Sequence, residues 1–136
     1  DVIEHGDDDG AALAVARRAL ATGGILLVTV PAYRWLWSGH DLALGHRRRY
    51  TARELARRVE RAGFRVAQRS YFNTLLFPGI ALVRLGKRLR RDTRHDLRRP
   101  PAPLNRLLAA VFSLEGLVVP RVSLPFGTSV LLIAHR

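Results

Sequence analysis

The chain has 136 residues and a mass of 15.2 kDa, which suits one domain with one hydrophobic core. With 48% hydrophobic and 25% charged residues, its composition is that of a globular protein and excludes a disordered or fibrous chain. The absence of cysteine excludes disulfides and thiolate chemistry, and the formal net charge of +12 favours phosphate-bearing or membrane-surface partners.

The N-terminal quarter predicts a strand, a helix and a second strand. Residues 1–5 are read as the C-terminal end of a strand, and because the chain begins at Asp1 and contains no methionine, we expect it to be a fragment of a longer protein. Helical spacing of Leu13, Ala16 and Leu20 predicts a helix over residues 9–21. The apolar run 25–30 predicts a strand covered on both faces, as in a parallel sheet, and the three elements then form a right-handed crossover unit.

The middle of the chain carries the strongest helix signal. Thr51 and Glu54 form a capping box ahead of an apolar stripe, and Gly63 ends the helix predicted over residues 52–62. Loose alternation over residues 64–71 predicts an outer strand, and the apolar run 129–134 predicts the last one. Because helices and strands alternate, the predicted class is α/β.

Residues 72–127 are too many for one structureless loop, so we expect helices there. Apolar spacing predicts helices over residues 74–91 and 104–118, joined by an extended proline-rich link over residues 98–103. The longest apolar stretch, residues 75–83, is far short of the roughly 20 residues that a membrane-spanning helix needs.

Ligands of open α/β sheets bind beyond the carboxyl ends of the strands, and two such ends are visible. One carries Glu4 and His5, and the other opens at Pro31 into a loop that runs to Tyr50. Because this loop is rich in aromatic, imidazole and arginine side chains, we interpret it as an active-site loop. The alternative is that its tryptophans plug the sheet edge and its arginines are solvated.

Two kinds of catalytic site are disfavoured by the spacing of their residues. His40, Asp41 and His46 match no compact metal-ligand pattern, so no metal is expected. No Gly-x-Ser-x-Gly elbow follows a strand, so serine hydrolysis is not expected either.

Asp1-Val2-Ile3-Glu4-His5 and the stretch 23–31 resemble the second half of class I S-adenosylmethionine-dependent methyltransferases. The stretches 38–41, 45–51 and 71–73 resemble a signature of one subgroup of that family. The resemblance implies a Rossmann-like sheet of parallel strands with a terminal antiparallel strand, and a helical insertion before that last strand. The family's glycine-rich cofactor loop would precede Asp1, so the fragment is expected to be inactive alone.

The resemblance also implies site residues. The cofactor is S-adenosylmethionine, with Asp1, Val2, Glu4 and His5 beside it and with His5 and His46 as the candidate catalytic bases. The implied contacts to a small-molecule or amphiphilic acceptor are Tyr33, Trp35, Trp37, His40, Asp41, Arg48, Arg49 and Tyr50. For His5 the alternative is a capping role, and for His46 it is a hydrogen bond that staples the loop.

Residues 1–71 and 128–136 are assigned to the methyltransferase domain and residues 72–127 to an inserted lid that recognises the acceptor. An apolar-then-basic pattern over 72–99 also fits peripheral contact with an anionic membrane and a lipid-linked acceptor. We expect a cytoplasmic protein, at the inner face of the membrane if that contact forms, that binds no nucleic acid. The alternative function is a basic nucleic-acid-binding or membrane-surface module without catalysis.

Overall fold

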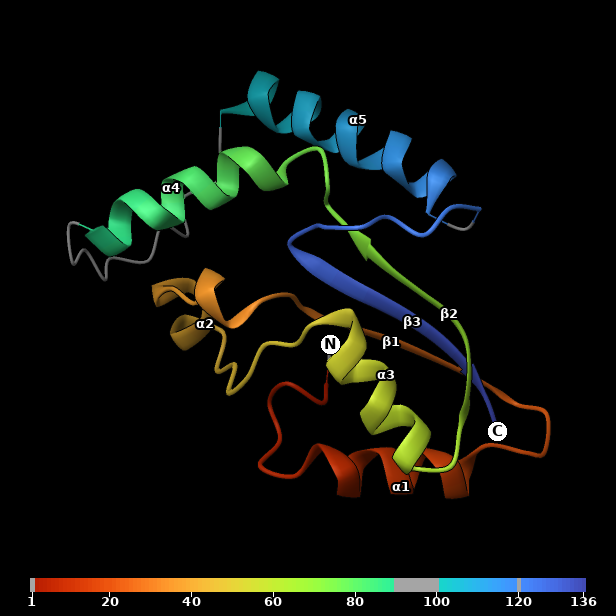
Figure 1. Cartoon of the computed structure of the whole chain (residues 1–136). Helices are drawn as coiled ribbons and strands as arrows, with labels where there is room; N and C mark the ends of the chain where they lie inside the picture. The colour runs from red at the N-terminus through yellow and green to blue at the C-terminus, as the bar shows by residue number, and fades with distance from the viewer. Residues whose placement is uncertain (1, 90–100, 120) are drawn as a thin grey trace.

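The computed structural model describes residues 2–89, 101–119 and 121–136, and its helices and strands alternate (Figure 1). In chain order the elements are α1 (Asp9–Ala19), β1 (Ile25–Pro31), the 3-10 helix η1 (Arg34–Leu36), α2 (Gly39–Ala43), α3 (Ala52–Arg61), β2 (Arg65–Phe72), α4 (Phe77–Leu89), α5 (Ala102–Val118) and β3 (Ser129–His135). The predicted α/β class is therefore confirmed, and so are the helices and strands predicted after residue 8.

The sheet has three strands in the order β1-β3-β2. The last strand, β3, lies between the other two and is antiparallel to both, with Val130 opposite Val30 on one side and Tyr71 on the other. β1 and β2 therefore run in the same direction, but β3 separates them. The predicted antiparallel last strand is confirmed, whereas no two named strands in the described part of the chain are parallel neighbours.

Two predictions about the first strands are wrong. Residues 3–5 form a turn closed by a 3.1 Å hydrogen bond from His5 N to the Val2 carbonyl. The described residues before α1 therefore contain no strand, and the predicted strand–helix–strand crossover unit is absent. The Glu4 carbonyl accepts from Arg47 N at 2.8 Å, so the distant loop satisfies backbone that a strand ladder would otherwise use. β1 is not covered on both faces, because Ile25 and Leu27 are each 61% exposed.

One face of the sheet forms the core, and local signals position the helices that cover it. Asp8 Oδ1 accepts from Ala11 N at 3.0 Å and caps α1, while Thr51 and Glu54 cap α3 reciprocally. α1 and α3 bury apolar side chains against β1 and β3, on the lower side of the view in Figure 1. This core consists mainly of Leu13, Val28, Val30, Tyr50, Leu55, Ala56, Val59, Phe64, Val130 and Leu132.

α4 and α5 both lie on the side of the molecule opposite α1 and α3 (Figure 1). The buried carboxylate of Glu115 on α5 accepts from Thr74 N at 2.5 Å and Leu75 N at 3.2 Å, which ties α5 to the start of the α4 segment. Gln68 Nε2 donates to the Val119 carbonyl at 2.9 Å, which fixes the same, C-terminal end of α5 to β2. Residues 98–100 of the predicted extended link lie outside the described residues.

Candidate active site

The loop after β1 is closed at its base by Tyr50. Tyr50 N donates to the Pro31 carbonyl at 3.0 Å, Tyr33 N donates to the Tyr50 carbonyl at 2.9 Å, and Ala32 forms a parallel bridge with Tyr50. The far part of the loop reaches the N-terminal turn, where His5 Nδ1 lies 3.2 Å from the Gly45 carbonyl oxygen. The end of β1 and the Glu4–His5 turn therefore share one region of the molecule.

Asp41 is the centre of the loop's hydrogen bonding. Its fully buried carboxylate accepts from Ser38 N at 2.9 Å, from Arg49 Nε at 2.8 Å and from His46 Nδ1 at 3.1 Å. Arg49 is also buried and donates to the Ala32 carbonyl at 2.7 Å, so the pair ties α2 to the end of β1. Burial would raise the pKa of Asp41, but the hydrogen bonds from His46 and Arg49 outweigh it and lower that pKa.

Glu4, His5 and His46 form a cluster beside this network. The two imidazole rings meet edge-on with centroids 4.9 Å apart, and His5 Nε2 lies 3.8 Å from Glu4 Oε1. The Glu4 side chain is fully buried, and neither of its carboxylate oxygens has a hydrogen-bond partner among the described residues. The cluster therefore combines two imidazoles with a buried carboxylate that accepts no hydrogen bond from the described residues.

A second buried carboxylate, Asp9, organises the arginines on the other side of the loop. Tyr50 Oη donates to Asp9 at 2.9 Å, Arg58 donates at 2.7 Å, and Arg48 lies 3.3 Å away. Burial opposes ionisation of Asp9, but the Tyr50 hydrogen bond and the charges of Arg58 and Arg48 lower its pKa. For Tyr50, burial and the Asp9 charge raise the pKa, so the phenol stays protonated.

A pocket of about 490 Å³ opens over these groups. Its walls carry five arginines and one glutamate, and Trp37 supplies aromatic surface. The complete lining is Arg34, Trp37, Arg47, Arg48, Arg49, Tyr50, Glu54 and Arg58. Several of these arginines are paired with Asp7, Asp9 or Asp41, so their positions are held while the lining remains predominantly cationic.

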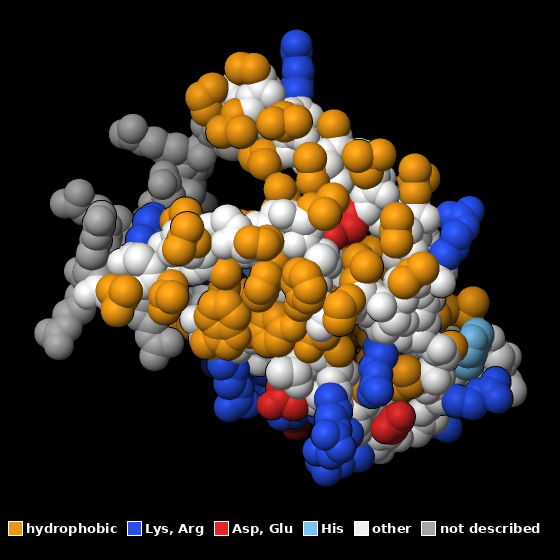
Figure 2. Space-filling view, turned by 45° about the horizontal axis from the view of Figure 1, so that its top comes forward, with side chains coloured by type: hydrophobic (Ala, Val, Ile, Leu, Met, Phe, Trp, Pro, Cys, Tyr) orange, Lys and Arg blue, Asp and Glu red, His pale blue; other side chains and the backbone are white. Residues whose placement is uncertain are grey.

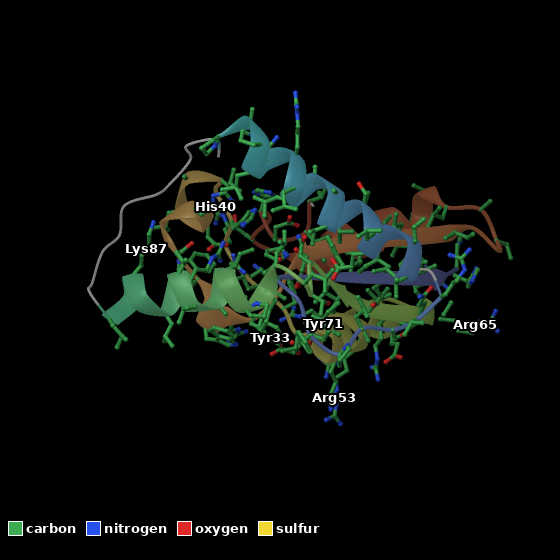
Figure 3. The ribbon with its side chains drawn as sticks, turned by 90° about the horizontal axis from the view of Figure 1, so that it is seen from above. Tyr33, His40, Arg53, Arg65, Tyr71 and Lys87 are labelled. Carbon is green, nitrogen blue, oxygen red and sulfur yellow. The ribbon has the colours of Figure 1, made fainter. Side chains whose placement is uncertain are left out.

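The remaining aromatic residues join the loop to α4. Tyr33 stacks on Tyr71 with ring centroids 5.1 Å apart and on Trp35 at 5.9 Å, and Phe77 meets Trp35 edge-on at 5.9 Å. Figure 3 shows Tyr33 and Tyr71 close together near the middle of the molecule. Trp35 remains 45% exposed, so this cluster offers an apolar surface next to the loop.

The structure separates the predicted site residues into groups. Glu4, His5 and His46 come together, and Trp37, Arg48, Arg49 and Tyr50 line the pocket. Asp41 and Arg49 bind each other and are both buried, so they hold the loop, and Arg49 meets the pocket with only a small part of its surface. His40 lies on α2, where burial and the nearby Arg84 charge lower its pKa, while Val2 is exposed and Asp1 lies outside the described residues.

Five residues of this region were missed from the sequence. Arg34, Arg47 and the α3 residues Glu54 and Arg58 line the pocket, and Asp9 holds Arg58 and Arg48. The apolar stripe of α3 marks its core face, and the polar residues beside that stripe are the signal that could have directed attention to Glu54 and Arg58.

Two comparisons with known proteins found a match. A family model described as "Methyltransferase domain" matches residues 1–69, which hold α1, β1, the loop, α3 and most of β2. A solved structure of selenomethionine-labelled phosphoethanolamine N-methyltransferase 2 from Haemonchus contortus, in complex with S-adenosyl-L-methionine, is similar over 100% of this chain with a TM-score of 0.51 and 15% identity. At that identity the likeness is one of fold.

The chain spans 31% of the length of that solved structure. No curated protein sequence matches it. The family model covers 69 of the 136 residues, just over half of the chain. On that match, the chain belongs to the methyltransferase-domain family.

Proposed function

We propose that this chain provides the acceptor side of an S-adenosylmethionine-dependent methyltransferase whose acceptor is a small amphiphilic molecule with an anionic group. Membership of the family implies methyl transfer and the cofactor. The observation that carries the proposal for the acceptor is the pocket lined by five arginines and one glutamate. Guanidinium groups bind phosphate and carboxylate in a bidentate manner, and a pocket of about 490 Å³ is large enough for a small molecule.

The N-terminal turn fits one wall of the cofactor site. Val2 is 72% exposed and offers apolar surface, and the His5 side chain is 41% exposed beside it. Glu4 differs from this expectation because its carboxylate is fully buried, so we place it behind that wall. The cofactor supplies an electrophilic methyl group, and the described residues contribute orientation and proton handling.

His46 is the better placed of the two proposed bases. Its Nδ1 lies 3.1 Å from the buried Asp41 carboxylate, an arrangement that favours the tautomer with the proton on Nδ1. Nε2 then carries the lone pair and can accept a proton from an acceptor. In this proposal Asp41 is a positioning residue, because it acts through His46.

A methyl-transfer assay tests the acceptor class. The full-length protein is given labelled S-adenosylmethionine and matched pairs of small acceptors that differ in one phosphate or carboxylate group. We expect methylation of the anionic members. Arg34→Ala should raise KM about tenfold or more with little change in kcat, because it removes one charge-assisted contact from the pocket wall.

Arg53 is a matched control, because it is an exposed arginine of α3 outside the pocket lining and points away from the body in Figure 3. Arg53→Ala should leave KM unchanged. Equal methylation of charged and neutral acceptors, or equal effects of the two substitutions, would contradict an anionic acceptor.

The amphiphilic part of the proposal is supported by α4 and α5. No helix in the described ranges is long and apolar enough to cross a bilayer. The two helices nevertheless expose many large apolar side chains, and Figure 2 shows hydrophobic atoms gathered over this end of the molecule. The most exposed are Leu82, Val83, Leu85 and Leu89 on α4, and Leu107, Leu114 and Leu117 on α5.

One residue expected on the membrane-facing side lies elsewhere. Arg84 donates to the Leu36 carbonyl and lies 3.8 Å from Asp41, so this charge points into the protein. The arginines at positions 90, 91 and 94, which belong to the basic part of the 72–99 pattern, lie outside the described residues. With Arg84 turned inward, the exposed apolar surface carries the proposed contact with lipid or with the acceptor's hydrophobic tail.

Co-sedimentation with vesicles tests this contact. Leu82→Gln and Leu114→Gln should reduce binding, whereas Val15→Gln, which changes an exposed apolar residue on α1, should not. Binding that is indifferent to all three substitutions would remove the lipid contact from the proposal.

A further inference from the structure

The buried carboxylate of Glu4 lacks the compensation that a buried charge requires. Its side chain has no exposed surface, and both carboxylate oxygens are without a hydrogen-bond donor among the described residues. The backbone is held in place, because the Glu4 carbonyl accepts from Arg47 N at 2.8 Å. A buried carboxylate in this state is costly unless a cation meets it.

Two imidazoles converge on the same point. One nitrogen from each of His5 and His46 and one oxygen of Glu4 all lie within 4.8 Å of one another. His5 Nε2 and Glu4 Oε1 are 3.8 Å apart. Two ligand atoms that each lie about 2.1 Å from a tetrahedral ion are roughly 3.4 Å apart, so the three groups would have to close by no more than about 1.4 Å to coordinate one ion.

Both histidines have Nδ1 within hydrogen-bond distance of an acceptor. His5 Nδ1 lies 3.2 Å from the Gly45 carbonyl oxygen, which can only accept, and His46 Nδ1 lies 3.1 Å from an Asp41 carboxylate oxygen. Each Nδ1 is therefore placed to donate, which leaves Nε2 as the nitrogen available to an ion. Metal-binding histidines are commonly oriented by this second hydrogen bond to a carbonyl or carboxylate.

A simple ion pair explains less of this geometry. A protonated His5 that neutralised Glu4 would place its Nε2 about 2.7–2.9 Å from the carboxylate, and the observed separation is 3.8 Å. The cationic group of a bound cofactor would satisfy Glu4 but would leave both imidazole lone pairs unused. A divalent ion uses all three groups.

We propose that Glu4, His5 and His46 bind one divalent transition-metal ion of the zinc type. One carboxylate and two imidazoles suit Zn²⁺ and its neighbours in the first transition row better than Mg²⁺ or Ca²⁺, which prefer oxygen ligands alone. Three protein ligands leave a coordination position open to water or to an oxygen atom of the acceptor. The site goes beyond methyl transfer and replaces the expectation from the sequence that no metal binds.

Metal binding and proton removal by His46 exclude each other in the same molecule, because both use the Nε2 lone pair. The test therefore uses the metal alone, without cofactor or acceptor, and its result does not depend on the proposed function. Methyl transfer measured with and without added metal then reports separately on that function.

The experiment titrates Co²⁺ into the chelator-treated full-length protein and follows the visible absorption of the ion. We expect one ion per chain. Glu4→Gln and His46→Ala should each weaken binding about 100-fold or more, and Asp41→Asn about 10- to 100-fold, because Asp41 orients His46. His135→Ala, which removes an imidazole at the end of β3 outside the cluster, should have no effect.

Nitrogen NMR of the wild-type protein removes any dependence on how well the variants fold. Zn²⁺ should shift the Nε2 signals of His5 and His46 and leave those of His135 in place. Absence of one-to-one binding, or binding that survives Glu4→Gln, or signals that move only at other histidines, would overturn the proposal.

Discussion

Replacing Asp41 by alanine should destabilise the protein more than any change to a surface charge. The carboxylate is fully buried and is bound by Arg49 through Nε at 2.8 Å and through a second nitrogen at 2.7 Å. Asp41→Ala leaves the Arg49 guanidinium, which is 4% exposed, with the Ala32 carbonyl as its remaining described hydrogen-bond acceptor. Breaking a buried pair in this way costs about 3–5 kcal/mol, since one charge remains uncompensated.

Urea unfolding followed by circular dichroism measures this loss. At roughly 4 °C per kcal/mol for a chain of this size, Tm should also fall by about 12–20 °C. Asp7→Ala is the matched control, because Asp7 also pairs with an arginine of the loop, Arg47, but on the surface. Its loss should stay below about 1 kcal/mol.

The reason for the loss is tested by a double-mutant cycle. With Arg49 already replaced by methionine, Asp41→Ala should cost about 1–3 kcal/mol less than in the wild type, because no buried guanidinium is left unpaired. Equal costs in the two backgrounds, or a loss for Asp41→Ala no larger than that for Asp7→Ala, would refute the account of this network.

Three further predictions follow from other parts of the structure. Gly127→Ala should destabilise the protein by about 2 kcal/mol or more, since its Cβ would lie 2.2 Å from the Phe72 carbonyl oxygen. Gly86→Ala, which adds a methyl group in open space on α4, should stabilise the protein by about 0.5–1 kcal/mol. Equal effects of the two substitutions in urea unfolding would contradict this packing. Thr51→Ala should cost about 1 kcal/mol by removing the reciprocal cap of α3, and an unchanged unfolding midpoint would argue against that cap. Because the pKa of Asp9 is lowered below its ordinary value of 3.8, the folded state binds fewer protons than the unfolded state between these two values. The stability that Asp9 contributes is therefore present above pH 3.8 and is lost as the pH falls through that window. Asp9→Asn should remove this part of the pH dependence, and an unaltered stability profile in acid would contradict it.

Local signals predicted most of the secondary structure correctly. Thr51, Glu54 and Gly63 lie next to the backbone groups that they satisfy, so α3 could be bounded from the sequence alone. The strand predicted at residues 1–5 was wrong because a strand depends on a partner, and the Glu4 carbonyl instead bonds to Arg47, more than forty positions along the chain. The prediction that both faces of β1 are covered was wrong for the same reason, since the exposure of Ile25 and Leu27 depends on what packs against them.

The candidate site was predicted by residue type but not by arrangement. The loop was singled out because imidazole, aromatic and arginine side chains are abundant in it, and its role as an active-site loop stays a prediction. That Asp41 takes up Arg49, or that Asp9 holds Arg48 and Arg58, follows from contacts between distant segments. No periodicity in the sequence specifies which arginine faces the pocket and which is buried.

Titration calorimetry of the full-length protein with S-adenosylmethionine tests the central claim most directly. We predict saturable binding at one site per chain, with S-adenosylhomocysteine competing for it. A protein that is folded by circular dichroism and yet gives no binding at millimolar cofactor would contradict the assignment of this chain to methyl transfer.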